Sequence, residues 1–273
     1  MRAFFANKSN TLFVVLAAIF LTNALVAEFI GVKIFSLEKT LGLTPADINL
    51  FGVNNLSFNL TCGVLMWPVV FVLTDIINEY YGMRGVRFLS WIAAVMIAYA
   101  FIVFFVGIRL VPADFWPNSH IHADWTPEHK SEMISKVGDY NEAFKLVFGQ
   151  GLWIIVGSLV AFLIGQIVDV FVFHRIKEIT GERKIWLRST GSTLISQFID
   201  SFVVLFIAFY IGASWSLSLV FAIGIVNYIY KFGMALILTP VIYWVHTMVE
   251  KYLGHELATQ MKSEAMRPEK KSV

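Results

Sequence analysis

Long apolar stretches alternate with short polar segments along this chain, and their lengths are typical of helices that cross a lipid bilayer. The stretches 57–74, 86–108 and 152–166 contain no Asp, Glu, Lys or Arg apart from Arg87. Because an α-helix rises about 1.5 Å per residue, one crossing takes about 20 apolar residues. The stretches and their flanks therefore predict about six transmembrane helices, at about 11–35, 57–79, 87–108, 152–174, 192–213 and 217–246.

The polar segments predict how these helices are connected. The segment between the first two helices is rich in Gly, Pro and Asn, which are typical of turns. A long external loop at about 109–148 joins the third and fourth helices and contains a predicted surface helix near 127–136. A tight turn is expected at 213–216. We divide the chain into a transmembrane domain, 1–249, and a charged, partly disordered tail, 250–273.

Composition agrees with an all-α, polytopic membrane protein. Hydrophobic residues make up 58% of the chain, charged residues 15%, and the mean hydropathy is +0.71, whereas soluble domains carry about 25% charged residues. The net charge of +2 and the lack of a basic stripe exclude a nucleic-acid partner. Cys62 is the single cysteine, so an internal disulfide and CxxC chemistry are excluded.

The distribution of Lys and Arg predicts the orientation of the helices. With the N-terminus inside, cytoplasmic segments contain 14 of these residues and external segments contain five. Cytoplasmic loops of membrane proteins carry such an excess of positive charge. We therefore expect both termini to be cytoplasmic.

Polar residues interrupt most of the predicted helices in a regular way. Four helices carry a pair of polar residues spaced three or four apart, which places each pair on one helix face. These pairs are Asp75/Glu79, Gln166/Asp169, Gln197/Asp200 and Asn227/Lys231, and the first helix adds Asn23. Because lipid cannot solvate such groups, the pairs are expected to face a common polar interior. The third helix has no such pair.

Two interpretations of this interior remain open from the residues alone. The amides could join helices by hydrogen bonds, and Lys231 could form a buried ion pair with Asp200 or Asp169. Alternatively, the groups line a solute cavity. Asp75, Asp169 and Asp200 outnumber the single central cation, and this excess of acceptors suits a ligand rich in N–H donors, protons or a cation. The pairs together favour a cavity.

A short sequence pattern occurs twice. The segments 165–172 and 196–203 both read small–Gln–apolar–apolar–Asp–x–Phe–Val, in helices predicted to run in opposite directions. They represent either two inverted copies of one polar site or a chance match between apolar sequences.

The chain resembles the queuosine precursor transporter family, which is of the vitamin uptake transporter type. The resemblance covers most of the chain, and its most specific parts are the Gly-Gln-x-x-Asp block and the downstream Ser-Thr block. The long loop and Trp67-Pro68, in place of Phe-Pro, depart from the family pattern. The residues that carry the resemblance are Asn23, Trp67-Pro68, Thr74-Asp75, Tyr81-Gly82, Arg84, Arg87, Gly165 to His174, Trp186 to Arg188, Ser192-Thr193, Gln197, Asp200, Asn227-Tyr228 and Lys231.

The resemblance implies uptake of a 7-deazaguanine across the inner membrane, such as 7-cyano-7-deazaguanine, 7-aminomethyl-7-deazaguanine or queuine. Asp169 or Asp200 would accept hydrogen bonds from the donor edge of the base, and Gln166, Gln197 or Asn227 would complete the site. Lys231 would bind O6 or hold an ion pair. Asn23 and Asp75 would line the cavity.

Other functions compete with this one. The chain could be the substrate-binding subunit of an energy-coupling-factor vitamin importer, although its first helix lacks a clean stripe of small residues. A membrane-embedded enzyme is disfavoured because no HExxH motif or aspartyl dyad is recognisable. No phosphate-binding loop occurs, so this chain does not hydrolyse ATP. No cofactor or metal is predicted, and a homo-oligomer remains open.

Overall fold

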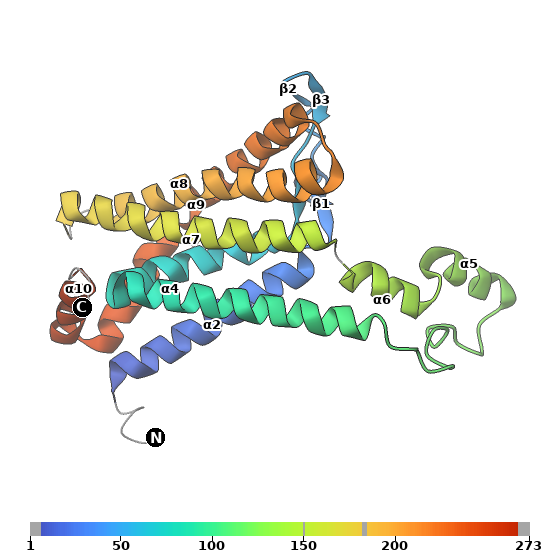
Figure 1. The fold of residues 1–273 in the computed structure, drawn as a ribbon, viewed down its shortest axis with the longest axis horizontal. Coiled ribbons are helices and arrows are strands. Elements are labelled where there is room, and N and C mark those ends of the chain that lie inside the picture. Colours follow the sequence, from blue (N-terminus) through green and yellow to red (C-terminus); the bar gives the residue numbers. More distant parts are fainter. Residues whose placement is uncertain (1–6, 150, 182–184, 267–273) are drawn as a thin grey trace.

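The computed structural model describes residues 7–149, 151–181 and 185–266, and within these ranges it confirms an all-α, multi-pass membrane fold. Five helices are long and apolar enough to cross a bilayer. They lie side by side as a bundle (Figure 1). They are α2 (Lys8–Ile30), α4 (Trp67–Gly107), α7 (Leu152–Thr180), α8 (Ile185–Leu205, continued by a π-helical segment, Phe206–Ile211) and α9 (Leu217–Leu253).

Helix α4 accounts for two of the six predicted spans. Its 41 residues would extend about 60 Å if straight, which is about twice the thickness of the bilayer hydrocarbon core. At Gly82 the backbone is non-helical, with φ 69° and ψ −173°, a conformation that is essentially restricted to glycine. The chain reverses there, and the two halves of α4 run as separate rods (Figure 1). The second and third predicted spans are these two halves.

The boundary of the second span was predicted wrongly. Residues 57–66 form strand β4 (Asn59–Thr61) and a 3-10 turn (Cys62–Leu65), and the helix begins only at Trp67. Proline has no N–H to donate and fits the first helical turn. Trp67-Pro68 therefore starts the helix instead of interrupting it. The first span also ends earlier than predicted, at Ile30.

The segment between α2 and α4 covers one end of the bundle (Figure 1). Strand β1 (Ile34–Ser36) pairs with β4 in antiparallel register, with Phe35 opposite Leu60. A second hairpin pairs β2 (Ile48–Leu50) with β3 (Val53–Leu56), and a short helix, α3 (Leu37–Thr40), lies between. The buried carboxylate of Glu38 accepts a hydrogen bond from the backbone N–H of Phe58, which ties these elements together.

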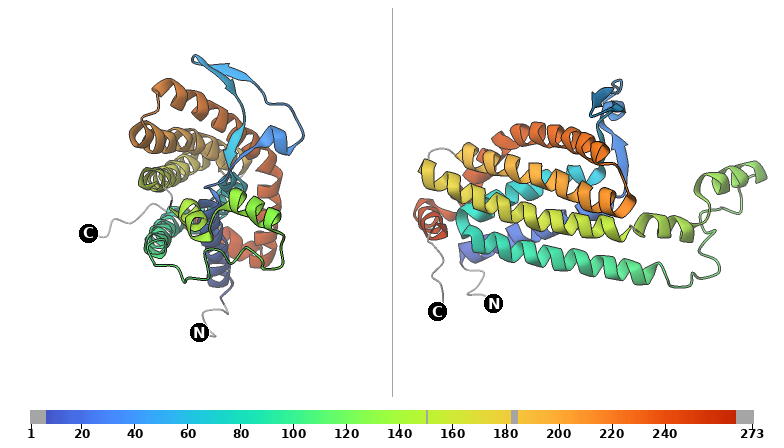
Figure 2. Two further views of the ribbon diagram at one scale, coloured as in Figure 1. Left: turned by 90° about the vertical axis from the view of Figure 1, so that its right-hand side faces the viewer. Right: turned by 45° about the horizontal axis from the view of Figure 1, so that its top comes forward.

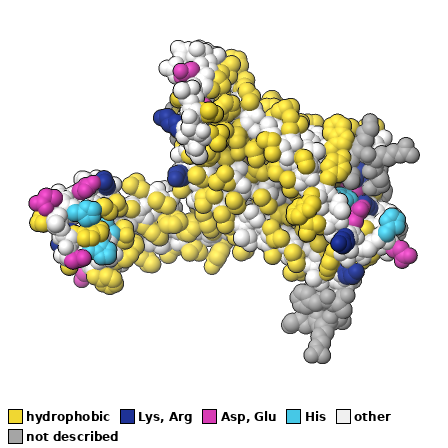
Figure 3. All heavy atoms as spheres, turned by 180° about the vertical axis from the view of Figure 1, so that it is seen from behind, with side chains coloured by type: hydrophobic (Ala, Val, Ile, Leu, Met, Phe, Trp, Pro, Cys, Tyr) yellow, Lys and Arg dark blue, Asp and Glu magenta, His cyan; other side chains and the backbone are white. Residues whose placement is uncertain are grey.

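The predicted long loop extends from the same end of the bundle as a helical arm (Figure 2). It contains α5 (Pro127–Val137), which confirms the predicted surface helix, and α6 (Tyr140–Phe148). Acidic and histidine side chains gather at the tip of the arm, whereas the bundle presents a broad apolar band (Figure 3). This band is the surface expected to face lipid.

Within the predicted tail, residues His255–Ala265 form a helix, α10. Its Ala258 and Met261 are buried in the main hydrophobic cluster, and Lys262 forms an ion pair with Glu250 at 2.5 Å. Residues 267–273 lie outside the described residues. Helix α10 and the start of α2 lie at the same end of the bundle (Figure 1). Their cytoplasmic location stays a prediction.

We expect Gly82→Ala to lower the free energy of unfolding by about 1–3 kcal/mol, because alanine is strained in this backbone conformation. The added Cβ would also lie 2.7 Å from the carbonyl oxygen of Ala265 in α10. The measurement is the melting temperature of the purified protein in detergent. The control is Gly107→Ala at the end of α4, where an added Cβ meets nothing within 4 Å. Equal melting temperatures for the two variants would contradict this account of the turn.

Candidate functional site

The larger of two cavities lies inside the bundle, beneath the pair of strands β1 and β4. Its volume is about 360 Å³, within the range of about 300–1,000 Å³ typical of small-molecule sites. Its walls come from α2, α4, α7, α8 and α9 as well as the strands. The polar and aromatic side chains that line it are Glu28, Asn59, Thr61, Trp67, Phe71, Ser158, Phe162, Gln166, Gln197, Asp200, Phe209, Trp215, Asn227, Tyr230 and Lys231.

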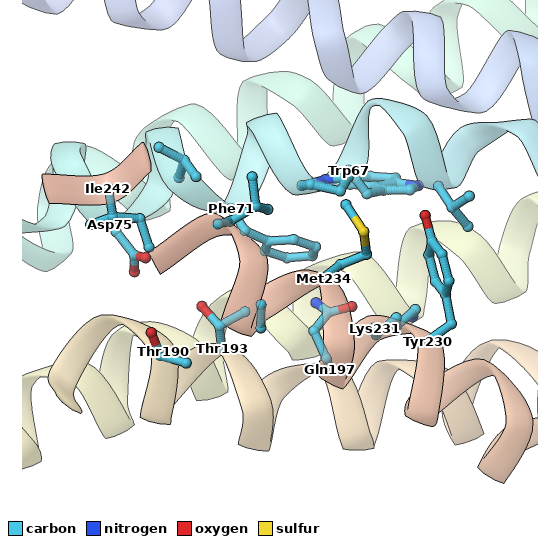
Figure 4. A pocket seen from close by; sticks show the side chains of 15 residues that line it. Trp67, Phe71, Asp75, Thr190, Thr193, Gln197, Tyr230, Lys231, Met234 and Ile242 are labelled. Atoms are coloured by element: carbon cyan, nitrogen blue, oxygen red, sulfur yellow. The ribbon is translucent and has the colours of Figure 1, made fainter. Parts of the chain in front are cut away.

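A smaller cavity, of about 50 Å³, lies next to the first. The two cavities share Trp67, Phe71, Gln197, Tyr230 and Lys231 in their walls. Figure 4 shows Trp67 and Phe71 of α4 facing residues of α8 and α9 across this space. The smaller cavity also reaches the following residues, which lie further toward the Gly82 end of the bundle: Asp75, Thr190, Thr193 and Ile242. The cavities together mark a path from the β1–β4 cover toward that end.

An ion pair between α8 and α9 occupies the wall of the large cavity. Lys231 Nζ lies 2.5 Å from Asp200 Oδ2, and the two side chains are 21% and 22% exposed. This confirms one of the two predicted pairings of Lys231. Because both groups border the cavity, a polar ligand can exchange hydrogen bonds with either member without leaving an isolated charge in the bilayer.

Two glutamines present amide groups toward the same space. The carbonyl oxygen of Gln166 accepts hydrogen bonds from Thr74 at 3.3 Å and from Ser90 at 3.4 Å. The amide nitrogens of Gln166 and Gln197 are buried and have no hydrogen-bond partner in the described part of the chain. Each amide nitrogen can donate two hydrogen bonds. Ser90 lies in the third predicted span, which has no pair of polar residues, and contributes this one polar contact.

The structure separates the predicted site residues into two groups. Asp75 borders the smaller cavity, and Gln166, Gln197, Asp200, Asn227 and Lys231 border the large one. Asn23 and Asp169 border neither. The Asn23 amide donates to the carbonyl of Ile19 in its own helix. Asp169 is 1% exposed and accepts a hydrogen bond from Ser196 at 3.2 Å.

Several lining residues were missed by the sequence analysis. Glu28 was not among the predicted site residues, yet it is buried in the cavity wall and accepts a hydrogen bond from Ser158. The aromatic side chains of the wall were not among them either. Trp67 lies 5.6 Å from Phe162 and 6.1 Å from Phe71, measured between ring centroids. Pro68 was the one sequence feature that could have identified Trp67 as a lining residue. Proline favours the first turn of a helix, so it places Trp67 at the beginning of α4.

The repeated pattern has a matching geometry. Helices α7 and α8 pack side by side, and the small residue of each copy lies against the aspartate of the other. Ser196 donates to Asp169, and a Cβ added at Gly165 would lie 3.7 Å from Asp200 Cβ. Because α7 and α8 run antiparallel and are joined by a short connection, this exchange of neighbours fits two inverted copies of one polar site as well as a chance match.

Known proteins of the same type were found by sequence comparison. A family model described as "Putative vitamin uptake transporter" matches residues 61–245, more than half of the chain. A probable queuosine precursor transporter of Bacillus subtilis (strain 168) is 30% identical over 207 residues, which is 74% of this chain and 76% of that protein. No solved structure is significantly similar to the chain.

Two further relatives have related names. A probable queuosine precursor transporter of Haemophilus influenzae (strain ATCC 51907 / DSM 11121 / KW20 / Rd) is 27% identical, covering 74% of this chain and 72% of that protein. The queuosine precursor transporter of Escherichia coli (strain K12) is 26% identical, covering 58% and 59%. The apolar helices and these similarities identify a multi-pass membrane transporter and not an enzyme. The chain belongs to the vitamin uptake transporter family, which is the family of the queuosine precursor transporters.

Proposed function

We propose that this protein imports a 7-deazaguanine, a precursor of queuosine, across the inner membrane, and that the large cavity is its binding site. The observation that carries the proposal is one wall that combines a carboxylate, an ammonium group and two buried amide nitrogens without partners. The names of the relatives support the substrate class. The cavity volume of about 360 Å³ suits a planar bicyclic base.

The chemistry of the base matches this wall. The N1–H and the exocyclic amine of a deazaguanine are adjacent donors, which suit the two oxygens of the Asp200 carboxylate. O6 is an acceptor, which suits the ammonium group of Lys231 or the amide of Gln197. Both residues of the Asp200–Lys231 pair would then keep a partner when the base binds. Because the pair is part of the cavity wall, it holds the two charges in place before the substrate arrives.

The aromatic residues supply the remaining contacts. Trp67 and Phe71 form one side of the space shared by the two cavities, and Tyr230 forms part of the other (Figure 4). Aromatic rings pack favourably against the flat faces of heterocycles. This stacking would hold the base while its edge is read by hydrogen bonds. The 7-substituent would then occupy the rest of the larger cavity.

The first test is growth-linked uptake. The chain is expressed in a bacterial strain that can neither make nor import queuosine precursors and that lacks energy-coupling-factor modules. With nanomolar 7-cyano-7-deazaguanine in the medium, we expect queuosine to appear in tRNA. Asp200→Asn should lower the initial uptake rate at least about tenfold, because lost charge-assisted hydrogen bonds cost about 1.5–3 kcal/mol.

A matched control separates binding from folding. Asp124→Asn makes the same change on the exposed arm, and it should transport like the unchanged protein at equal membrane abundance. Absence of rescue with any deazaguanine would overturn the substrate assignment. Rescue only after an energising module is supplied would instead identify an energy-coupling-factor subunit.

The second test concerns the edge of the base. 7-Deazaadenine presents an acceptor at N1 and a donor at position 6, the reverse of 7-deazaguanine. Leaving buried groups unsatisfied costs about 1–3 kcal/mol, so 7-deazaadenine should inhibit uptake about 5–150 times more weakly than 7-deazaguanine. Asp200→Asn should narrow this ratio, because an amide both donates and accepts. Equal inhibition by the two compounds in the unchanged protein would rule out recognition of this edge.

A further inference from the structure

Two carboxylates lie outside the wall of the large cavity. Asp75 on α4 and Asp169 on α7 are 3% and 1% exposed. The hydrogen bonds from Thr74 to Gln166 and between Asn78 and His174 join α4 to α7 on either side of the two carboxylates, which places them on facing stretches of these helices. Both lie within membrane-spanning helices, where an ionised carboxylate is costly unless a cation balances it.

The hydrogen-bond partners of this pair are hydroxyl groups. Ser189 donates to Asp75 Oδ2, and Ser196 donates to Asp169 Oδ1 at 3.2 Å. The second oxygen of each carboxylate, Asp75 Oδ1 and Asp169 Oδ2, is buried and has no hydrogen-bond partner within residues 7–149, 151–181 and 185–266. A hydroxyl donates a single hydrogen bond and brings no net charge. These contacts cannot neutralise two negative charges.

The cations near the pair bind another carboxylate. Arg188 on α8 lies 2.7 Å from Glu79, and Lys177 on α7 lies 3.1 Å from the other oxygen of Glu79. His174 on α7 is hydrogen-bonded to Asn78 at 2.8 Å.

The ionisable groups of the other packed helices are also engaged elsewhere. On α9, Lys231 is paired with Asp200, and His246 contacts Tyr80 at 3.2 Å. On α2, the carboxylate of Glu28 accepts a hydrogen bond from Ser158. None of these contacts places a cation directly against Asp75 or Asp169.

We propose that Asp75 and Asp169 together bind one proton, and that this proton is carried inward with the substrate. Two neighbouring carboxylates with little solvent do not both ionise readily, and sharing a proton relieves their repulsion. The coupling to substrate rests on the proposed function, whereas the shared proton does not.

The repeated pattern provides a physical link between the proton and the substrate. Asp169 and Gln166 lie on one face of α7, and Gln166 borders the large cavity. Ser196, the partner of Asp169, precedes Gln197, which borders both cavities. Asp75 borders the smaller cavity, toward the Gly82 end. Movement of α7 against α8 when the base binds would thus change the surroundings of the proton site.

The first experiment detects the proton without any substrate. Infrared spectra of the purified full-length protein in liposomes near neutral pH should contain the C=O band of a buried, protonated carboxyl group. The band should be lost in Asp75→Asn or in Asp169→Asn, and it should remain in the control Asp114→Asn, on the exposed segment leading to the arm. Absence of this band from the unchanged protein, or its persistence in both variants, would overturn the shared proton.

The second experiment measures coupling with 7-cyano-7-deazaguanine as the probe. One proton per base allows up to about tenfold accumulation for a pH gradient of one unit, alkaline inside. Folded Asp75→Asn and Asp169→Asn proteins should exchange labelled for unlabelled base but accumulate none. Gradient-independent uptake by the unchanged protein would overturn the coupling. A protonated band without binding of any deazaguanine would leave the proton site standing and contradict the proposed function instead.

Discussion

The cost of placing ionisable groups in an apolar bundle constrains this structure throughout. Each such group must meet a partner from a neighbouring helix, and the partners determine which helices adjoin. Asp200 meets Lys231 across α8 and α9, and Glu79 meets Arg188 across α4 and α8. Glycine permits the closest approach of α7 to α8: a Cβ added at Gly157 would lie 3.2 Å from the backbone of that neighbour. Close packing of the helices brings their polar faces together, and these faces line a cavity that suits a polar ligand.

Much of the fold follows from hydropathy because lipid imposes a simple rule on helix length. The six apolar segments, the surface helix of the arm and the turn before α9 were predictable for that reason. The junction at Gly82 was not, since periodicity does not show that a helical pattern reverses at one glycine with positive φ. Nor was the start of α4 at Trp67, because 57–66 is as apolar as a membrane helix but pairs as a strand with β1. The helical tail was missed because charge alone does not reveal that Ala258 and Met261 are buried.

The candidate site was predictable only in part, for a related reason. Spacing identifies which residues share a helix face, so the polar pairs of α7, α8 and α9 were found. Spacing does not identify which member of a pair reaches a cavity. Gln166 borders the cavity while Asp169, one turn away, is enclosed between α7 and α8. The aromatic wall could not be separated from packing residues, because Trp and Phe occur in both settings and the position of Trp67 depends on a helix start that was misplaced.

The difference between the two copies of the repeated pattern has a mechanistic consequence. Asp169 and Asp200 have equivalent sequence surroundings and exchange small neighbours, Ser196 and Gly165. They differ in the group that balances their charge, since Lys231 lies against Asp200 and hydroxyl groups surround Asp169. A lysine on α9 breaks the symmetry of the pair. In the proposed mechanism, one copy keeps a fixed charge for recognising the ligand, while the other gains and loses a proton. In an inverted pair, a motion that opens one aspartate to one side of the membrane tends to close its counterpart. Ligand recognition at Asp200 and proton exchange at Asp169 would thus occur one after the other.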